Sequence, residues 1–254
     1  KGFTDAGLAE IQEGLYRRLS KSKANILVPL GKTALQALTD KSSIDKWRGS
    51  IIAASCISPE PEIDGRKIVA TYHPAYSLRG NYLARYIIAS DLERVERESR
   101  FPDIDAPRRN IRVDPSLDEA LSYLREARDC PAIATDIEVY NGQVSCFSVA
   151  IAADDVMSIP ILGKTGADAW TEGEEAEIWL AYAALMGDPA ILKINHNITF
   201  DISLLTAQNR IVTRGALGDT MIAYNILYPD FLKRLEFVTS LYTREPYYKD
   251  DKKL

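Results

Sequence analysis

The sequence predicts an α/β protein made of two blocks, because strand-like apolar runs alternate with helical patterns on both sides of a proline-containing linker. The run ILKINHN at 191–197 precedes a helical pattern, as in a β-α unit. Strand-like runs at 131–139, 143–152 and 155–161 follow one another through short turns, which indicates antiparallel pairing. The expected second block is therefore a mixed sheet with helices on its faces.

The first block, residues 1–100, is expected to be a smaller α/β unit. Its predicted helices are 5–19, 32–39 and 81–99, and its predicted strands are 25–30 and the two runs SIIAASCI and KIVATY around an Asp64-Gly65 turn. The segment FPDIDAPRRN at 101–110 has two prolines and no periodicity, which is typical of a linker. The domain limits follow as 1–100 and 111–254.

The second block has further elements around its three central strands. The run IRV at 111–113 predicts a short strand, and amphipathic patterns predict helices at 115–127, 174–187 and 198–208. Pro115 stands at the start of the first of these helices, where its missing N–H costs nothing.

Composition excludes several classes of protein. The 254 residues carry 31 basic and 36 acidic side chains, and this net charge of −5 neither favours nor excludes a nucleic-acid binder. The three cysteines include no C-x-x-C pair, so no disulfide framework, zinc site or iron-sulfur cluster is expected, and an intracellular setting fits. No apolar run approaches the roughly 18 residues of a membrane span. The helical pattern at the start and the run KDDKKL at the end suggest a piece of a larger protein.

Two acids lie one residue apart on the first central strand. Asp136 and Glu138 point to the same face, because alternate residues of a strand share a face, while Ile133 and Ile137 pack on the other. Their repulsion is relieved by a cation or a proton, and a divalent metal is the simplest partner. Oxygen ligands favour Mg²⁺ or Mn²⁺ over zinc. The alternative is an exposed, solvated acidic pair.

A second polar element follows where the strand 191–197 meets its helix. Asn197 and Asp201 are four residues apart and share one face of the helix start, which is the usual place for sites in α/β sheets. The alternative gives Asn197 the role of N-cap and Asp201 that of a favourable charge in the first turn.

Together, D-x-E at 136–138 and N-x-x-F-D at 197–201 resemble the DEDD superfamily of 3'-5' exonucleases, and most closely the proofreading domain of family A DNA polymerases. The resemblance covers about 110–254 and implies an RNase H-like fold. It implies that Asp136 bridges two Mg²⁺ or Mn²⁺ ions, that Glu138 binds the ion that activates water, and that Asp201 holds the other ion. It also implies that Asn197 and Phe200 seat the 3' end of the substrate.

The third motif of these exonucleases is a Tyr followed four residues later by an Asp in a late helix. Tyr247 and Asp251 have this spacing, but their surroundings EPYYKDDKKL are polar and without helical periodicity. The alternative is that the motif lies beyond Leu254 and that the fragment has an incomplete metal site. Asp219, in the segment GDTMIAYNILYPD, is expected to cap a helix rather than bind metal.

The first block resembles the later half of family 4 of the uracil-DNA glycosylase superfamily. The resemblance rests on LGKTAL, WRG at 47–49 and TYHPAYSLRG at 71–80. It implies that His73 faces a flipped base and that Leu78 points towards the duplex. The alternative is that His73-Pro74 is simply a rigid turn with a buried, hydrogen-bonded His. Glycosylase activity is not expected, because the catalytic glycine-rich motif would precede residue 1 and the cluster cysteines have no counterpart.

A glycosylase-like block ahead of a proofreading exonuclease resembles the polymerases of large bacteriophages. The expected protein is thus an internal, cytoplasmic fragment of a DNA polymerase that acts on single-stranded 3' ends or primer-template DNA, with a polymerase domain on the same chain and no membrane contact. Two alternatives stay open: an RNase D-like ribonuclease, and a non-catalytic scaffold that holds DNA or docks a polymerase.

Overall fold

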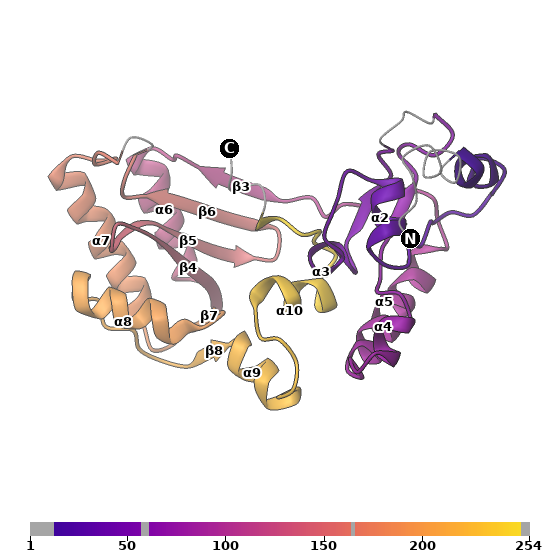
Figure 1. Cartoon of the computed structure of the whole chain (residues 1–254). Coiled ribbons are helices and arrows are strands. Elements are labelled where there is room, and N and C mark those ends of the chain that lie inside the picture. Colours follow the sequence, from indigo (N-terminus) through magenta and orange to yellow (C-terminus); the bar gives the residue numbers. More distant parts are fainter. Residues whose placement is uncertain (1–12, 57–60, 164–165, 250–254) are drawn as a thin grey trace. The chain divides into compact units, whose positions relative to one another are not determined.

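The computed structural model describes residues 13–56, 61–163 and 166–249, and the chain divides into two compact units (Figure 1). The first unit consists of Lys1–Pro107 together with Arg234–Leu254, and the second of Arg108–Lys233. The last segment thus groups with the first unit, whereas the sequence-based limits assign it to the second block. Each unit is described by itself.

The second unit is built on a six-stranded mixed sheet with the order β3-β6-β5-β4-β7-β8. Only β5 runs antiparallel to its neighbours, which gives the RNase H-like arrangement expected from the sequence. The strands are β3 Asn110–Val113, β4 Ala132–Tyr140, β5 Gln143–Ala152, β6 Asp155–Pro160, β7 Leu192–Asn195 and β8 Leu217–Asp219. The predicted meander and the parallel strand that follows it are both present.

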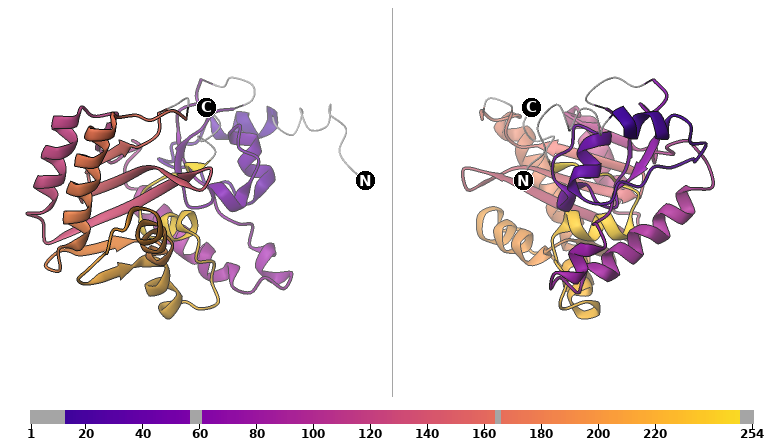
Figure 2. Two further views of the ribbon diagram at one scale, coloured as in Figure 1. Left: turned by 90° about the vertical axis from the view of Figure 1, so that its left-hand side faces the viewer. Right: turned by 45° about the vertical axis from the view of Figure 1, so that its right-hand side comes forward.

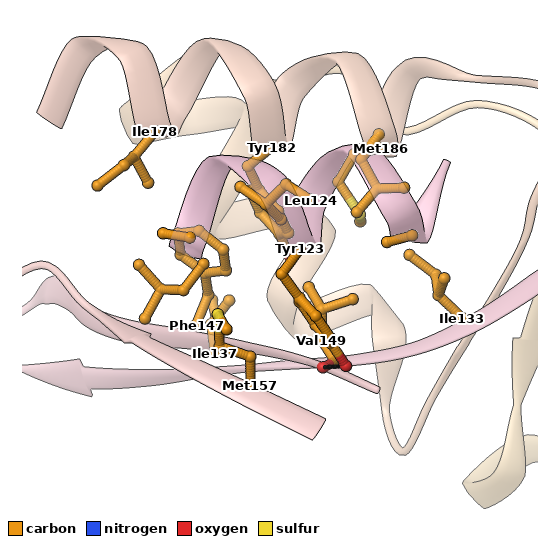
Figure 3. Packing of buried hydrophobic residues seen from close by; sticks show 14 of the residues in the cluster. Tyr123, Leu124, Ile133, Ile137, Phe147, Val149, Met157, Ile178, Tyr182 and Met186 are labelled. Atoms are coloured by element: carbon orange, nitrogen blue, oxygen red, sulfur yellow. Dashed lines mark hydrogen bonds between the residues drawn. The ribbon is translucent and has the colours of Figure 1, made fainter. Parts of the chain in front are cut away.

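Helices α6 (Leu117–Ala127) and α7 (Glu172–Gly187) lie side by side over one face of the sheet (Figure 2). Both begin with a capping box, at Ser116 and Thr171, in which hydroxyl and glutamate satisfy two orphan N–H groups. The main core lies beneath these helices, and the buried Tyr123 hydroxyl donates to the Val149 carbonyl at 3.1 Å (Figure 3).

Two further helices of the second unit follow the parallel strands. Helix α8 is Ile198–Asn209 and comes directly after β7, and helix α9 is Thr220–Leu227 and comes directly after β8. Since β7 and β8 are parallel and paired, the N-termini of both helices leave the same edge of the sheet.

The first unit has short elements. Its helices are 13–19, α2 Lys32–Leu38, α3 Ile44–Trp47, α4 Ala75–Leu78, α5 Ala84–Glu98 and α10 Leu235–Tyr242, and its strands are β1 Ile51–Ala53 and β2 Lys67–Val69. The start of the predicted helix 5–19 lies outside the described residues. The antiparallel pair around the Asp64-Gly65 turn is confirmed.

The prediction of a continuous strand at 25–30 is wrong. Leu27 and Leu30 form only isolated parallel bridges, with Ile68 and Thr71. Pro29 lies between the two bridges and has no N–H to donate, so a continuous ladder cannot form there.

A buried polar network joins α10 to the rest of the first unit. Arg48 is fully buried, pairs with Asp91, and donates to the Ser240 hydroxyl on α10 at 2.7 Å. Asp91 also accepts the Thr71 hydroxyl at 2.7 Å. Because buried charges need partners, this network fixes α10 in place.

No helix in the described part of the chain is long and apolar enough to cross a membrane.

Candidate active site

The two acids of β4 lie on the exposed face of the strand. Ile133, Thr135 and Ile137 are buried and alternate with exposed Asp136 and Glu138, as the period of two predicts. The pairing with β5 shifts directly after Glu138, so that one residue of β5 has no partner on β4. Bulges of this kind re-aim neighbouring side chains and are common beside active sites.

Asp201 on α8 reaches the backbone between these two acids. Its Oδ1 accepts the N–H of Ile137 at 3.0 Å. β4 pairs with β7 only through Ala132–Ala134, so beyond that point the N–H of Ile137 has no strand partner on this side, and the Asp201 carboxylate takes that role. A strand and a helix distant in sequence are thereby joined at the position of the acids.

Burial dominates the electrostatics of Asp201. The residue is 5% exposed, and desolvation raises the pKa of its carboxyl, against the opposing effect of the Ile137 N–H. The negative charge of Asp219 acts in the same direction as burial. A cation near this carboxylate would favour its ionised form.

The donor chemistry of this site fits a hard divalent cation, since Asp136, Glu138 and Asp201 offer only carboxylate oxygens. Within the described residues, however, no three His, Cys, Asp or Glu side chains are arranged so that they could hold an ion. Asp201 points to the strand backbone instead. The Asp201 carboxylate therefore lies beside the backbone that carries Asp136 and Glu138, and the three side chains are not gathered around one point.

Asn197 and Phe200 lie at the start of α8. Asn197 occupies the N-cap position in the left-handed conformation, with φ 71° and ψ 48°, and its side chain makes no capping hydrogen bond. The alternative of an ordinary side-chain cap is therefore wrong. Phe200 is 53% exposed in the first turn, although large apolar side chains are usually buried. Both side chains are available to a ligand.

Asp219 caps α9, as predicted, by accepting the N–H groups of Met221 and Ile222. Its carboxylate also accepts the N–H groups of Asn197 and Ile198. The second pair of bonds was not foreseen, because it depends on the pairing of β7 with β8.

Sequence reasoning also missed a buried support beneath the acids. The hydroxyl groups of Thr135 and Tyr182 lie 2.8 Å apart, and the Tyr182 ring stacks on Phe147 with 4.0 Å between ring centroids. Burial raises the pKa of the Tyr182 hydroxyl, so it stays protonated. β4 is thus pinned to α7 at the residue before Asp136.

Tyr247 belongs to the first unit and packs there. Its ring lies edge-on to Trp47 at 5.5 Å, and its N–H donates to the Ser50 hydroxyl at 3.1 Å. Asp251 lies outside the described residues. The packing of Tyr247 against Trp47 gives no support to a third-motif role.

His73 and Leu78 lie at an exposed corner of the first unit. The His73 ring is exposed, not buried as in a simple rigid turn, and its Nδ1 accepts the N–H of Ala75 at 3.1 Å. Leu78 is 82% exposed. Gly31 of the LGKTAL run has φ +86°, and a Cβ there would lie 3.2 Å from the His73 Cβ, so these two segments pack closely.

Comparison with known proteins gives a family for most of the second unit and for the segment 234–243, which groups with the first unit. A family model described as 3'-5' exonuclease, of the DNA polymerase A type, matches residues 115–243, just over half of the chain. No curated protein matches the chain.

Three solved structures resemble the chain with low sequence identity and low TM-scores. The EXO domain of Nibbler from Aedes aegypti is 18% identical, with a TM-score of 0.46, over 59% of this chain and 77% of that chain. RNase D from Escherichia coli is 18% identical, with a TM-score of 0.42, over 57% of this chain and 36% of that chain. The POL domain of Pol1 from M. smegmatis is 18% identical, with a TM-score of 0.43, over 56% of this chain and 24% of that chain.

The match of the family model contains the acids of β4, the start of α8 and the Asp219 cap. The chain therefore belongs to the 3'-5' exonuclease family of the DNA polymerase A type.

Proposed function

We propose that the second unit is the proofreading exonuclease of a DNA polymerase, which hydrolyses DNA from its 3' end and releases nucleoside monophosphates. The observation that carries this proposal is the bond between the Asp201 carboxylate and the N–H of Ile137. Because Ile137 lies between Asp136 and Glu138, this bond brings the Asp201 carboxylate of α8 beside the segment of β4 that carries the other two acids.

In this proposal Asp136, Glu138 and Asp201 hold two Mg²⁺ or Mn²⁺ ions, since these ions prefer oxygen ligands. When bound, the ions would supply the activation of water and the stabilisation of the departing 3' oxygen. Asp201 keeps its position through the Ile137 N–H. Asn197 offers an amide and Phe200 an exposed ring to the terminal nucleotide, since bases stack on aromatic faces.

The test is digestion of a single strand labelled at its 5' end, with DNA and RNA versions of one sequence and Mn²⁺ present. Wild-type protein is expected to shorten the DNA from the 3' end into a ladder, and Asp136→Asn is expected to abolish the ladder. Glu177→Gln, an exposed acid on α7, is the control that keeps full activity.

Two other outcomes identify the alternatives. Faster shortening of the RNA than of the DNA would favour an RNase D-like ribonuclease. Failure to cleave either strand, together with failure to bind Mn²⁺ in an electron paramagnetic resonance titration, would favour a non-catalytic scaffold, because a scaffold has no need of metal.

The wider context forms part of the same proposal. A polymerase domain on the same chain, a primer-template substrate and the cytoplasm of a bacterium or of a phage-infected host are proposed from the resemblance to phage polymerases. The three cysteines are free thiols, which fits a reducing compartment.

A second candidate function concerns the first unit. We propose that this unit binds DNA but does not cleave the bond between a base and its sugar. Between Gly65 and Ser90 the chain has no acidic residue. Leu78 and Tyr82 are strongly exposed in this stretch, beside the exposed Arg79. Basic side chains bind the phosphates of a nucleic acid and exposed aromatic side chains stack on its bases, and no neighbouring acidic residue in this stretch repels the phosphates.

Fluorescence anisotropy with a labelled duplex tests this second function. Leu78→Ala combined with Tyr82→Ala is expected to weaken binding several-fold. Leu180→Ala, at a leucine of the second unit that is 72% exposed, is the control. Equal affinity of all variants would contradict a DNA-binding role for this corner.

A further inference from the structure

One carboxylate in the second unit accepts four backbone N–H groups. Asp219 receives the N–H of Asn197 at 3.1 Å, of Ile198 at 3.0 Å, of Met221 at 2.8 Å and of Ile222 at 3.1 Å. Burial opposes the ionisation of Asp219, but these four donors outweigh it, and the pKa of Asp219 is lower than its ordinary value.

These donors belong to the starts of two helices, α8 and α9. The bonds to Met221 and Ile222 are an ordinary N-cap for α9, which begins directly after Asp219. The bonds to Asn197 and Ile198 cap α8, whose own N-cap side chain makes no such bond. The N-terminal ends of both helix dipoles thus point at one negative charge.

The second pair of bonds acts on the residues of the proposed site. Asn197 has the left-handed conformation, which Asn tolerates better than most residues with a side chain but which is still less favourable than the right-handed region. The Asp219 carboxylate accepts the Asn197 N–H and ties this residue to the start of α9. Phe200 and Asp201 follow in the same first turn, so their positions depend on how α8 begins.

We propose that Asp219 is a positioning residue of the exonuclease site. By sharing its carboxylate between α8 and α9, it holds the turn at Asn197 and thereby sets where Asn197, Phe200 and Asp201 stand relative to β4. This inference rests on the proposed function, because it assigns Asp219 a part in presenting the substrate-binding and metal-binding side chains.

The test compares Asp219→Asn with Thr171→Ala in the whole chain. Asparagine has the same shape but loses the charge and presents an N–H₂ group where Asp219 has an acceptor, so at least one of the four bonds breaks. Thr171→Ala removes a helix cap of the same kind from α7, away from the acids. It is the matched control for a loss of thermal stability alone.

Two measurements are needed. The first is amide hydrogen exchange of the segment 195–203, read by mass spectrometry. The second is a separate determination of kcat and KM for a single-stranded oligonucleotide, at a temperature where both variants are fully folded. We expect Asp219→Asn to speed exchange in this segment and to change kcat or KM by about tenfold, because small displacements at a site are costly. Thr171→Ala is expected to leave both unchanged.

Unchanged exchange at 195–203 in Asp219→Asn, or kinetic constants equal to those of Thr171→Ala, would overturn the inference. A rise in KM alone supports an effect through Asn197 and Phe200, and a fall in kcat alone supports an effect through Asp201. If the wild-type protein cleaves no nucleic acid, the proposed function fails, while hydrogen exchange still decides whether Asp219 holds the turn.

Discussion

At the residue scale, the chemistry of the site depends on two exposed acids held over a buried hydrogen bond. Asp136 and Glu138 face solvent from β4, and Thr135 on the buried face of the same strand is hydrogen-bonded to Tyr182. The strand that carries the exposed acids is therefore tied to α7 by a buried hydrogen bond next to Asp136.

Replacement of either exposed acid tests their role directly. Asp136→Asn and Glu138→Gln each remove one charge at nearly constant shape, so the fold is expected to persist. Cleavage is expected to fall by about a hundredfold or more, because charge stabilisation at a hydrolytic site carries much of the rate. Initial rates on a single-stranded substrate give the result, and a loss of less than threefold in both variants would contradict the assignment.

Removal of the hydroxyl beneath the acids is expected to reduce stability. Tyr182→Phe leaves the buried Thr135 hydroxyl without its partner, which costs about 1–3 kcal/mol of the free energy of unfolding. Urea denaturation measures this loss. The control is Tyr140→Phe, at an exposed tyrosine of β4, the strand that carries Thr135. It is expected to leave the free energy of unfolding unchanged. Equal free energies of unfolding of the two variants would show that the hydrogen bond does not contribute to stability.

At the element scale, the site depends on where strands stop pairing. β4 and β7 pair only through Ala132–Ala134, and α8 begins four residues after Ile194, the last partner of β4. The N–H of Ile137 is left for Asp201 because of this early end. The parallel pairing of β7 with β8 similarly brings Asp219 to the start of α8.

The loop before β8 supplies a prediction at this scale. Gly215 has φ +89°, and a Cβ at this position would lie 2.6 Å from the carbonyl oxygen of Pro189. Gly215→Ala is therefore expected to destabilise the second unit by about 2 kcal/mol or more. Thermal unfolding measures the effect. Gly142→Ala, which also has positive φ but meets open space, separates backbone strain from the clash.

Local pattern was enough to predict the elements that carry the acids. The alternation around Asp136 and the Asn141-Gly142 turn specify a hairpin by themselves, and both are present. The double role of Asp219 and the Thr135-Tyr182 bond were not predictable, because each joins segments far apart in sequence. The prediction of a continuous strand at 25–30 was wrong, because it relied on the apolar composition of the run and did not allow for the missing backbone N–H of Pro29.

At the scale of the whole molecule, the first unit is discontinuous in sequence. Its residues before Pro107 are completed by α10, which follows the exonuclease unit along the chain. Arg48 meets Asp91 and Ser240 in the interior, and Arg94 donates to the carbonyls of Gly49 and Leu241. The integrity of the first unit thus depends on a segment that the chain reaches last.

Disruption of this network tests the dependence. Arg48→Met leaves the Asp91 carboxylate buried without its ion-pair partner, which is expected to cost about 3–5 kcal/mol of the free energy of unfolding of the first unit. Limited proteolysis is expected to release the segment from Arg234 onward. Arg17→Met breaks an exposed pair with Glu13 in the same unit and is expected to cost at most about 1 kcal/mol. Equal protease resistance of the two variants would contradict the role of the network.

The identity of the first product decides whether the second unit is a 3'-5' exonuclease that acts through Asp201. A single DNA strand with a label on the phosphate before its last nucleotide is incubated with Mn²⁺ and either wild-type protein or Asp201→Asn, and the products are separated by chromatography. We expect wild-type protein to release labelled nucleoside monophosphate as the first product and Asp201→Asn to release none. Labelled oligonucleotides as first products, or equal release by both proteins, would contradict a 3'-5' exonuclease that acts through Asp201.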